Sequence, residues 1–118
     1  MIRHVFLYKV ASGADPKKVI EILNTLPKRV AGIRTWTLGK HQGAPGASGD
    51  LWDYALVCDF DSLAGLQKYS NDPYHMEVVE KLLPMFSARA VCDFEFDAAK
   101  QKQMHKSKSK GKSKRSNL

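Results

Sequence analysis

Residues 69–75, Tyr69-Ser70-Asn71-Asp72-Pro73-Tyr74-His75, predict a sharp break between two helices. Pro73 has no backbone N–H and disfavours helical geometry at Asp72, so the first helix should end near Ser70. A second helix should start at Pro73, with Asp72 as its N-cap. The break can bring Tyr69, at the end of one helix, close to His75, in the first turn of the next. Such a pair can carry acid–base chemistry, and it can equally stiffen a bent helix.

The residues around this break alternate between strand patterns and helix patterns. Strands are expected where apolar and aromatic residues alternate or run together, at 2–10, 34–41, 52–60 and 88–96. Helices are expected from Pro16 to the interruption at Pro27, and then at 61–70 and 73–86. The order β-α-β-β-α-β predicts an α+β, ferredoxin-like fold, in which the helices cover one face of a four-stranded antiparallel sheet.

The face of the sheet that the helices leave open is expected to be apolar. Its predicted members are Val5, Leu7, Ala55, Val57 and Val91. A monomer in water rarely exposes an apolar patch of this kind. Packing against the same face of a second copy would cover it, so the sequence predicts a homodimer.

The formal charge of +7 lies in the C-terminal residues. Residues 1–97 hold eleven Lys or Arg and twelve Asp or Glu, whereas residues 98–118 hold eight Lys or Arg and no acid. We therefore expect one folded domain at 1–97 and a disordered basic tail at 98–118. The folded part shows no general affinity for nucleic acid. The tail can contact nucleic acid or an anionic surface, serve as a nuclear address in a eukaryote, or only solubilise the chain.

Neither a membrane span nor a cofactor is expected. No run of about eighteen apolar residues occurs, and the N-terminus lacks the apolar centre of a signal peptide, so we expect a cytoplasmic protein. The His, Asp and Glu residues show no metal-ligand spacing, so no metal is predicted. Cys58 and Cys92 fall two strands apart, too far for a disulfide, and are expected to be small buried residues.

Four segments in this order resemble the stress-responsive A/B-barrel domain family, also called the dimeric α+β barrel or Dabb family. They are the first strand MIRHVFLYK at 1–9, the turn AGI at 31–33, the strand DYALV at 53–57 and the helix break at 69–75. The resemblance covers about residues 1–97 and implies two sheets that close a barrel across a dimer. Most members are stress-associated or uncharacterised proteins. One plant member, olivetolic acid cyclase, folds a linear polyketide by an intramolecular aldol condensation.

The resemblance also implies a pocket between the sheet and the helices. Tyr69 and His75 match a tyrosine and a histidine that act in the pocket of that cyclase, and His4 matches a pocket histidine on its first strand. Tyr54 stands where the cyclase has another histidine, and the Tyr–His pair recurs in members without known chemistry. Aromatic and apolar residues on the same strand faces complete an expected ligand site of His4, Phe6, Tyr8, Tyr54 and Leu56.

The catalytic hypothesis assigns separate roles to His75 and Tyr69. An imidazole with a near-neutral pKa can remove a proton next to a carbonyl, and a phenol can donate a hydrogen bond to the enolate oxygen. The structural alternative is that His75 caps a helix start and Tyr69 holds it in place. His4 has two possible roles as well, a hydrogen-bonded core histidine or a pocket residue.

Two functions from different classes remain open. The leading prediction is a dimer that binds a small apolar or aromatic molecule, with a cofactor-free, polyketide-cyclase-like activity if it is an enzyme. The alternative is a non-catalytic, stress-associated oligomer whose basic tail contacts nucleic acid or an anionic surface. The first requires a cavity open to solvent beside His75, whereas the second predicts a filled core at that place. Oxygenase-like activity without a cofactor also occurs on related dimeric barrels, and no residue selects it.

Overall fold

A computed structural model describes residues 1–45 and 49–100 of the chain. Four strands pair antiparallel in one sheet, in the order β2-β3-β1-β4. They are β1 (Ile2–Val10), β2 (Thr35–Lys40), β3 (Tyr54–Phe60) and β4 (Phe86–Glu95). This arrangement confirms the ferredoxin-like βαββαβ fold that the order of elements predicts.

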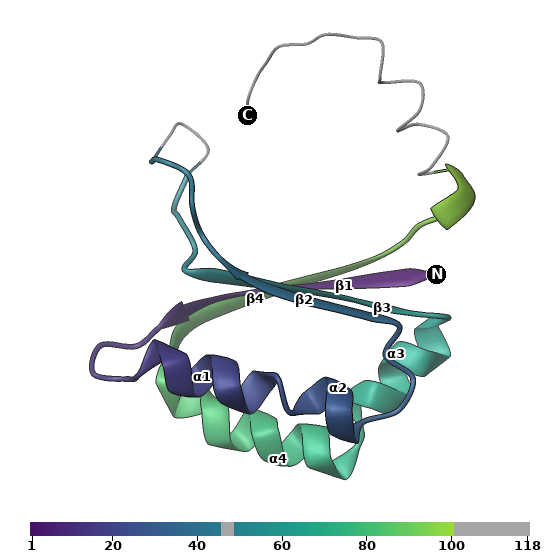
Figure 1. The fold of residues 1–118 in the computed structure, drawn as a ribbon, viewed down its shortest axis with the longest axis horizontal. Helices are drawn as coiled ribbons and strands as arrows, with labels where there is room; N and C mark the ends of the chain where they lie inside the picture. Colours follow the sequence, from purple (N-terminus) through teal and green to yellow (C-terminus); the bar gives the residue numbers. More distant parts are fainter. Residues whose placement is uncertain (46–48, 101–118) are drawn as a thin grey trace, which may run out of the picture.

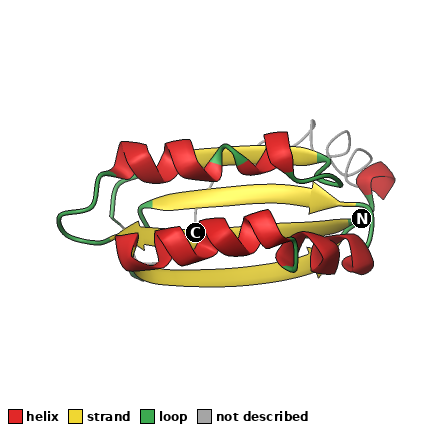
Figure 2. Ribbon diagram, turned by 90° about the horizontal axis from the view of Figure 1, so that it is seen from below, coloured by secondary structure: helices red, strands yellow, loops and turns green. Residues whose placement is uncertain are grey.

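The helices that connect the strands all lie on one face of the sheet, as Figure 1 shows from the side and Figure 2 from below. They are α1 (Pro16–Leu23), α2 (Leu26–Arg29), α3 (Leu63–Ser70) and α4 (Pro73–Leu82), followed by a short 3₁₀ helix (Leu83–Met85). The core lies between these helices and the sheet. Its most deeply buried side chains include Tyr8, Val19, Leu26, Phe60 and Leu82.

The break between α3 and α4 lies where the sequence predicts it. α3 ends at Ser70 and α4 begins at Pro73. The Asp72 carboxylate accepts hydrogen bonds from the backbone N–H groups of Tyr74 (2.8 Å) and His75 (3.4 Å), which confirms it as the N-cap. The cap fixes the first turn of α4 and with it the position of His75.

Two other helix boundaries differ from the prediction. α4 ends at Leu82 rather than near residue 86, because Pro84 cannot donate to the carbonyl four residues earlier and its ring clashes there. Phe86 therefore already belongs to β4. The first helix stops before Pro27 rather than at it. The Thr25 hydroxyl donates to the Ile22 carbonyl (2.6 Å), and Pro27 lies in the first turn of α2, where a missing N–H costs little.

None of the helices that connect the strands covers the other face of the sheet, the outer face (Figure 1). Residues paired across antiparallel strands point to the same side. The pairing of Val5 with Val57 and Cys92, and of Leu7 with Ala55 and Ala90, therefore places these side chains together. Phe94 lies two residues after Cys92 in β4, so its side chain points to the same side and also belongs to the outer face.

Two expectations about the strands are wrong. Val91 does not belong to the outer face, because it pairs with Phe6 and points toward the helices. Cys92 is exposed on the outer face rather than buried, since no described element packs over it, whereas Cys58 is buried on the helix side. Both thiols are free.

The predicted tail is described only at its start. Residues 98–100 are helical, and the Asp97 carboxylate accepts hydrogen bonds from the N–H groups of Ala99 (2.9 Å) and Lys100 (3.3 Å). The remaining tail residues, 101–118, lie outside the described part of the chain. Within residues 1–45 and 49–100, no helix has the length and hydropathy to cross a membrane. The same residues contain no group of three or more His, Cys, Asp or Glu side chains that could hold a metal ion.

Candidate functional site

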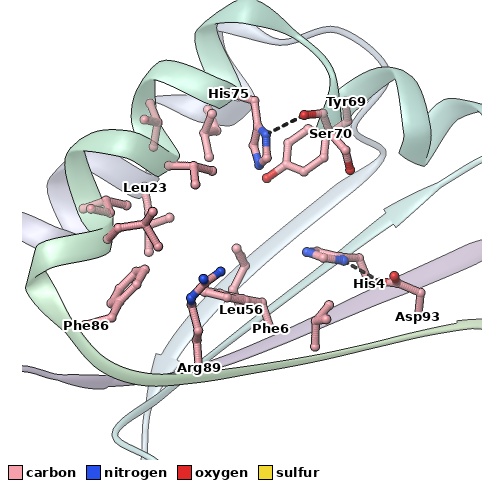
Figure 3. Close-up of a pocket in the computed structure, with 16 residues that line it drawn as sticks. His4, Phe6, Leu23, Leu56, Tyr69, Ser70, His75, Phe86, Arg89 and Asp93 are labelled. Carbon is pink, nitrogen blue, oxygen red and sulfur yellow. Dashed lines mark hydrogen bonds and ion pairs between the residues drawn. The ribbon is translucent and has the colours of Figure 1, made fainter.

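A cavity of about 390 Å³ lies between the sheet and the helices (Figure 3). Most of its wall is apolar, with contributions from Phe6, Leu23, Leu56, Val78, Leu82 and Phe86. Small-molecule sites in proteins commonly measure about 300–1,000 Å³ and have mainly apolar walls. The cavity therefore has the size and the lining of a site for a compact apolar molecule.

Three polar side chains meet along one part of this wall. The ring centroids of Tyr69 and His75 lie 4.3 Å apart, and those of Tyr69 and His4 lie 6.2 Å apart. Figure 3 shows the Tyr69 hydroxyl beside the His75 ring. The helix break thus brings Tyr69 and His75 together, as the sequence predicts, and β1 supplies His4 from the sheet.

The orientation of His75 is fixed by the end of α3. Its Nδ1 lies 3.1 Å from the backbone carbonyl oxygen of Ser70. A carbonyl only accepts hydrogen bonds, so Nδ1 carries a proton and Nε2 is left to accept one. Burial lowers the pKa of His75 below 6.5, and the nearby His4 adds to this, although the Ser70 carbonyl opposes it. The imidazole is therefore neutral at neutral pH.

Tyr69 is only 3% exposed, and its ring packs against Phe60 at a centroid distance of 5.0 Å. Burial, with a smaller contribution from Cys58, raises the pKa of Tyr69 above 10.0, so the phenol stays protonated. No hydrogen bond joins its hydroxyl to the other side chains drawn in Figure 3. The hydroxyl is therefore available as a donor to a molecule in the cavity.

His4 has a carboxylate partner that sequence analysis does not identify. Asp93 lies directly opposite His4 in the β1–β4 pair, and its Oδ1 is 2.5 Å from His4 Nδ1. The carboxylate accepts the proton of Nδ1, so Nε2 is the free nitrogen of His4. A carboxylate in this position orients the ring and stabilises the imidazolium that forms when Nε2 takes a proton. His4 is hydrogen-bonded to Asp93 and also lines the cavity.

The five predicted ligand-contacting residues divide into two groups. His4, Phe6 and Leu56 line the cavity. Tyr8 and Tyr54 are not among its lining residues and stack on each other, with ring centroids 5.1 Å apart and an interplanar angle of 12°. The Tyr8 hydroxyl is buried without a partner among the described residues, and burial raises its pKa. A ligand contact for Tyr8 and Tyr54 stays a prediction, and their observed contacts are with the core.

Arg89 is a second cavity residue that sequence analysis misses. It points from β4 into the cavity in Figure 3. The alternation of β4 offered a signal, because Arg89, Val91 and Asp93 share one parity. This signal is useful only when the side of the sheet that each set of alternate residues faces is known. The prediction placed Val91 on the outer face, so it assigned Arg89 and Asp93 to the wrong side as well.

These features define a class, the ferredoxin-like α+β proteins with a cavity between sheet and helices. The family model of the stress-responsive A/B-barrel domain, Dabb, matches residues 2–96. The chain therefore belongs to the Dabb family, which confirms the resemblance seen in its sequence. No curated protein sequence matches the chain significantly.

Solved structures agree on the fold. A dimeric ferredoxin-like protein of unknown function from Thermobifida fusca is 28% identical, with a TM-score of 0.67 over 80% of this chain and 90% of that chain. A dimeric protein of unknown function from Bacteroides fragilis is 24% identical, with a TM-score of 0.60 over 80% and 95%. The hydroxynitrile lyase from Passiflora edulis is 19% identical, with a TM-score of 0.72 over 81% and 93%.

Proposed function

We propose that this Dabb protein binds a small apolar or aromatic carbonyl compound in its cavity and catalyses proton transfer at the carbon next to the carbonyl. One observation carries the proposal. Tyr69, His75 and His4 present their hydrogen-bonding groups together in a cavity whose other walls are mainly apolar.

The roles of His75 and Tyr69 follow from their protonation states. Nε2 of the neutral His75 removes the proton, and the electron pair of the C–H bond moves into the enolate. The Tyr69 hydroxyl donates a hydrogen bond to the carbonyl oxygen as negative charge develops on it. Because its pKa is raised, Tyr69 remains a donor and does not lose its proton to the medium. The mainly apolar walls reduce the contact of a bound molecule with water and so strengthen both interactions.

The His4–Asp93 pair extends this chemistry to compounds with a second carbonyl. The enolate carbon can attack that carbonyl in an aldol step and form a new carbon–carbon bond. His4, protonated at Nε2 by water and held by Asp93, can give this proton to the resulting alkoxide, and His75 returns the proton it removed to water. A polyketide-cyclase-like reaction of this kind needs no cofactor. The hydroxynitrile lyase from Passiflora edulis supports the proposal only in that an enzyme uses the same fold.

The test does not require the natural substrate. Exchange of α-protons for deuterium is followed by NMR in D₂O, using a panel of aryl methyl ketones and aryl 1,3-diketones. We expect exchange to be catalysed by the wild-type chain and slowed about 100-fold by His75→Gln or Tyr69→Phe. The rate should rise with pH and level off near or below pH 6.5, because His75 acts as a base only when neutral.

The matched control is His41→Gln, which removes an exposed loop histidine outside the cavity lining. This variant should exchange as the wild type does. An unchanged rate in His75→Gln, on a compound that the wild type exchanges, would show that the assigned base is wrong. Absence of exchange and of binding across the panel would favour the non-catalytic alternative, whose tail residues 101–118 lie outside the described residues.

The second part of the proposal is a homodimer formed through the outer face. Phe94 on this face is 44% exposed, and its neighbours Val5, Leu7 and Val57 are apolar and only partly buried in the single chain. Exposed apolar surface of this kind favours association. The structures from Thermobifida fusca and Bacteroides fragilis are described as dimeric. Packing of two outer faces would close the dimeric α+β barrel that the family name describes.

A further inference from the structure

Arg89 places a positive charge in the cavity at a distance from the His4–Asp93 pair. Arg89 pairs with Tyr8 and Asp93 with His4 in the β1–β4 register, so both point to the helix side of the sheet. Four residues along a strand separate their Cα atoms by about 13 Å. The cavity thus has a cationic part near Arg89 and a proton-transfer part near His4, Tyr69 and His75.

The charge of Arg89 is not neutralised by any described group. The ion pairs of the described residues join Arg3 to Asp59, His4 to Asp93, Lys18 to Glu21 and Arg34 to Asp61. Asp93 is the one acid that lines the cavity in the described structure, and His4 already engages it. The segments that the structure does not describe contain no Asp or Glu; they are residues 46–48 and 101–118. These two segments therefore supply no side-chain carboxylate that could pair with Arg89.

Arg89 is an exposed residue at the edge of the cavity, and its side chain is directed toward the cavity rather than away from it. An arginine on an edge strand commonly extends its charge into water while its stem covers apolar neighbours. Figure 3 shows the Arg89 guanidinium reaching from β4 toward the cavity. A planar guanidinium offers a fork of N–H donors that matches the two oxygens of a carboxylate.

We infer that the ligand is a small apolar carboxylate that also carries a carbonyl, an aryl or alkyl oxo acid. Its carboxylate binds Arg89, its apolar body lies against Phe6 and Leu82, and its carbonyl reaches Tyr69. One guanidinium balances the single negative charge of a carboxylate, whereas a phosphate ester would bring more charge than the site offers. This inference rests on the proposed function and adds the chemical class of the ligand.

The experiment compares an acid with its neutral counterpart in the full chain. The probes are 4-oxo-4-phenylbutanoate and 4-oxo-4-phenylbutanamide, which share a shape and differ in charge. Dissociation constants are obtained from the NMR signals of the His4 and His75 rings at fixed salt concentration. The variants are Arg89→Gln, Arg89→Lys and the control Lys68→Gln, which removes an exposed lysine outside the cavity lining. All variants keep the basic tail, so anion binding to the tail is the same in each.

We expect the wild type to bind the acid at least about tenfold more tightly than the amide, since a charge-assisted hydrogen bond is worth this much or more. Arg89→Gln should abolish this preference and leave amide binding unchanged. Arg89→Lys should keep part of the preference, because it retains the charge but loses the fork. Lys68→Gln should behave as the wild type does.

The outcomes separate the inference from the function on which it rests. Equal binding of acid and amide by the wild type, or a preference that survives in Arg89→Gln, overturns the inference and leaves the proposed function standing. If neither probe shifts the His4 or His75 signals, the inference falls, and the proposed function falls with it only if the panel of aryl ketones also fails to bind. If Arg89→Gln loses both probes, Arg89→Lys decides: a retained preference for the acid supports the inference, and its absence overturns it.

Discussion

The two faces of the sheet are built from the same four strands but differ in how they are covered. On the helix side, Tyr8, Leu56 and Phe60 are buried beneath the helices. On the outer face, Val5, Leu7 and Val57 remain partly exposed, and Phe94 is 44% exposed. Because strand residues alternate between faces, one sequence of alternating side chains supplies both a core and the surface through which we propose that two copies associate.

The polar groups of the two faces differ in a second way. On the outer face, Asp59 is fully engaged: Arg3 donates to both carboxylate oxygens (2.8 and 2.9 Å), and the Thr35 hydroxyl donates to one of them (2.9 Å). On the helix side, His75 and Tyr69 keep hydrogen-bonding atoms directed at the cavity. Fully satisfied polar groups stabilise a structure, whereas polar groups left open in an apolar cavity are available for a ligand.

The largest expected effect comes from the helix side. Leu82→Ala removes a buried side chain that is 1% exposed and touches the cavity wall. It should lower the free energy of unfolding by about 3 kcal/mol, measured by urea denaturation. Leu63→Ala, at a helical leucine that is 54% exposed, is the control and should cost less than about 1 kcal/mol. A loss of under 1 kcal/mol in Leu82→Ala would mean that the helix side is not the core of the protein.

The next effect concerns the outer face. Val57→Lys introduces a charge between Val5 and Thr37, in the proposed dimer contact. It should weaken self-association at least about 100-fold, or about 2.7 kcal/mol, while the far-UV circular dichroism stays that of a folded chain. Sedimentation equilibrium measures the association. Glu80→Lys, on an exposed part of α4, should leave it unchanged. A wild-type chain that sediments as a monomer, or a Val57→Lys chain that still dimerises, would contradict the proposed contact.

A somewhat smaller effect is expected from the ion pair of Asp59 and Arg3. The hydrogen bonds from Arg3 hold the pKa of Asp59 below 3.8, and those from Thr35 act in the same direction against the effect of burial. The stabilisation is therefore complete above the unfolded value near 3.8 and is lost as the pH falls through the lower folded value. Asp59→Asn should cost about 2 kcal/mol at neutral pH.

Urea denaturation between pH 7 and pH 2 checks this prediction. The difference between wild type and Asp59→Asn should shrink as the pH decreases, because the wild-type carboxylate becomes protonated. Asp61→Asn is a suitable control, since its ion pair with Arg34 is exposed at both side chains. A difference that is constant with pH would show that the charge of Asp59 is not what stabilises the outer face.

The smallest effect should come from Tyr8→Phe. The Tyr8 hydroxyl is buried and unpaired among the described residues, so the folded state gains little from it. Its removal should leave the stability unchanged or raise it by up to about 1 kcal/mol, in contrast to Leu82→Ala. Thermal unfolding followed by circular dichroism measures the difference. A clear destabilisation would indicate a hydrogen-bond partner for the hydroxyl in the assembled protein.

Local chemistry made most of the fold predictable. Pro73 and Asp72 allowed the position of the helix break to be predicted to within one residue. A missing N–H and a capping carboxylate act on the backbone within a few residues. The end of α4 was less predictable, since Pro84 permits a 3₁₀ turn before the next strand and its length is not encoded in any periodicity. The family could also be recognised from four short segments in order.

The candidate site was only partly predictable, because it depends on strand register. Tyr69 and His75 are near in sequence, so the helix break sufficed to bring them together. Asp93 lies 89 residues from His4, and only the β1–β4 pairing makes them neighbours. The faces of Arg89 and Val91 depend on the same register, which a one-residue shift would reverse. Tyr8 and Tyr54 share the predicted strand face but pack further along it, outside the cavity lining.

An NMR titration of the His4 and His75 ring signals, first with pH and then with aryl carbonyl compounds, tests the proposed site most directly. We expect His75 to titrate with a pKa below 6.5 and both rings to shift saturably with a compound that fits the cavity. A His75 that titrates at or above 6.5, with neither ring responding to any compound of the panel, would contradict the proposed site.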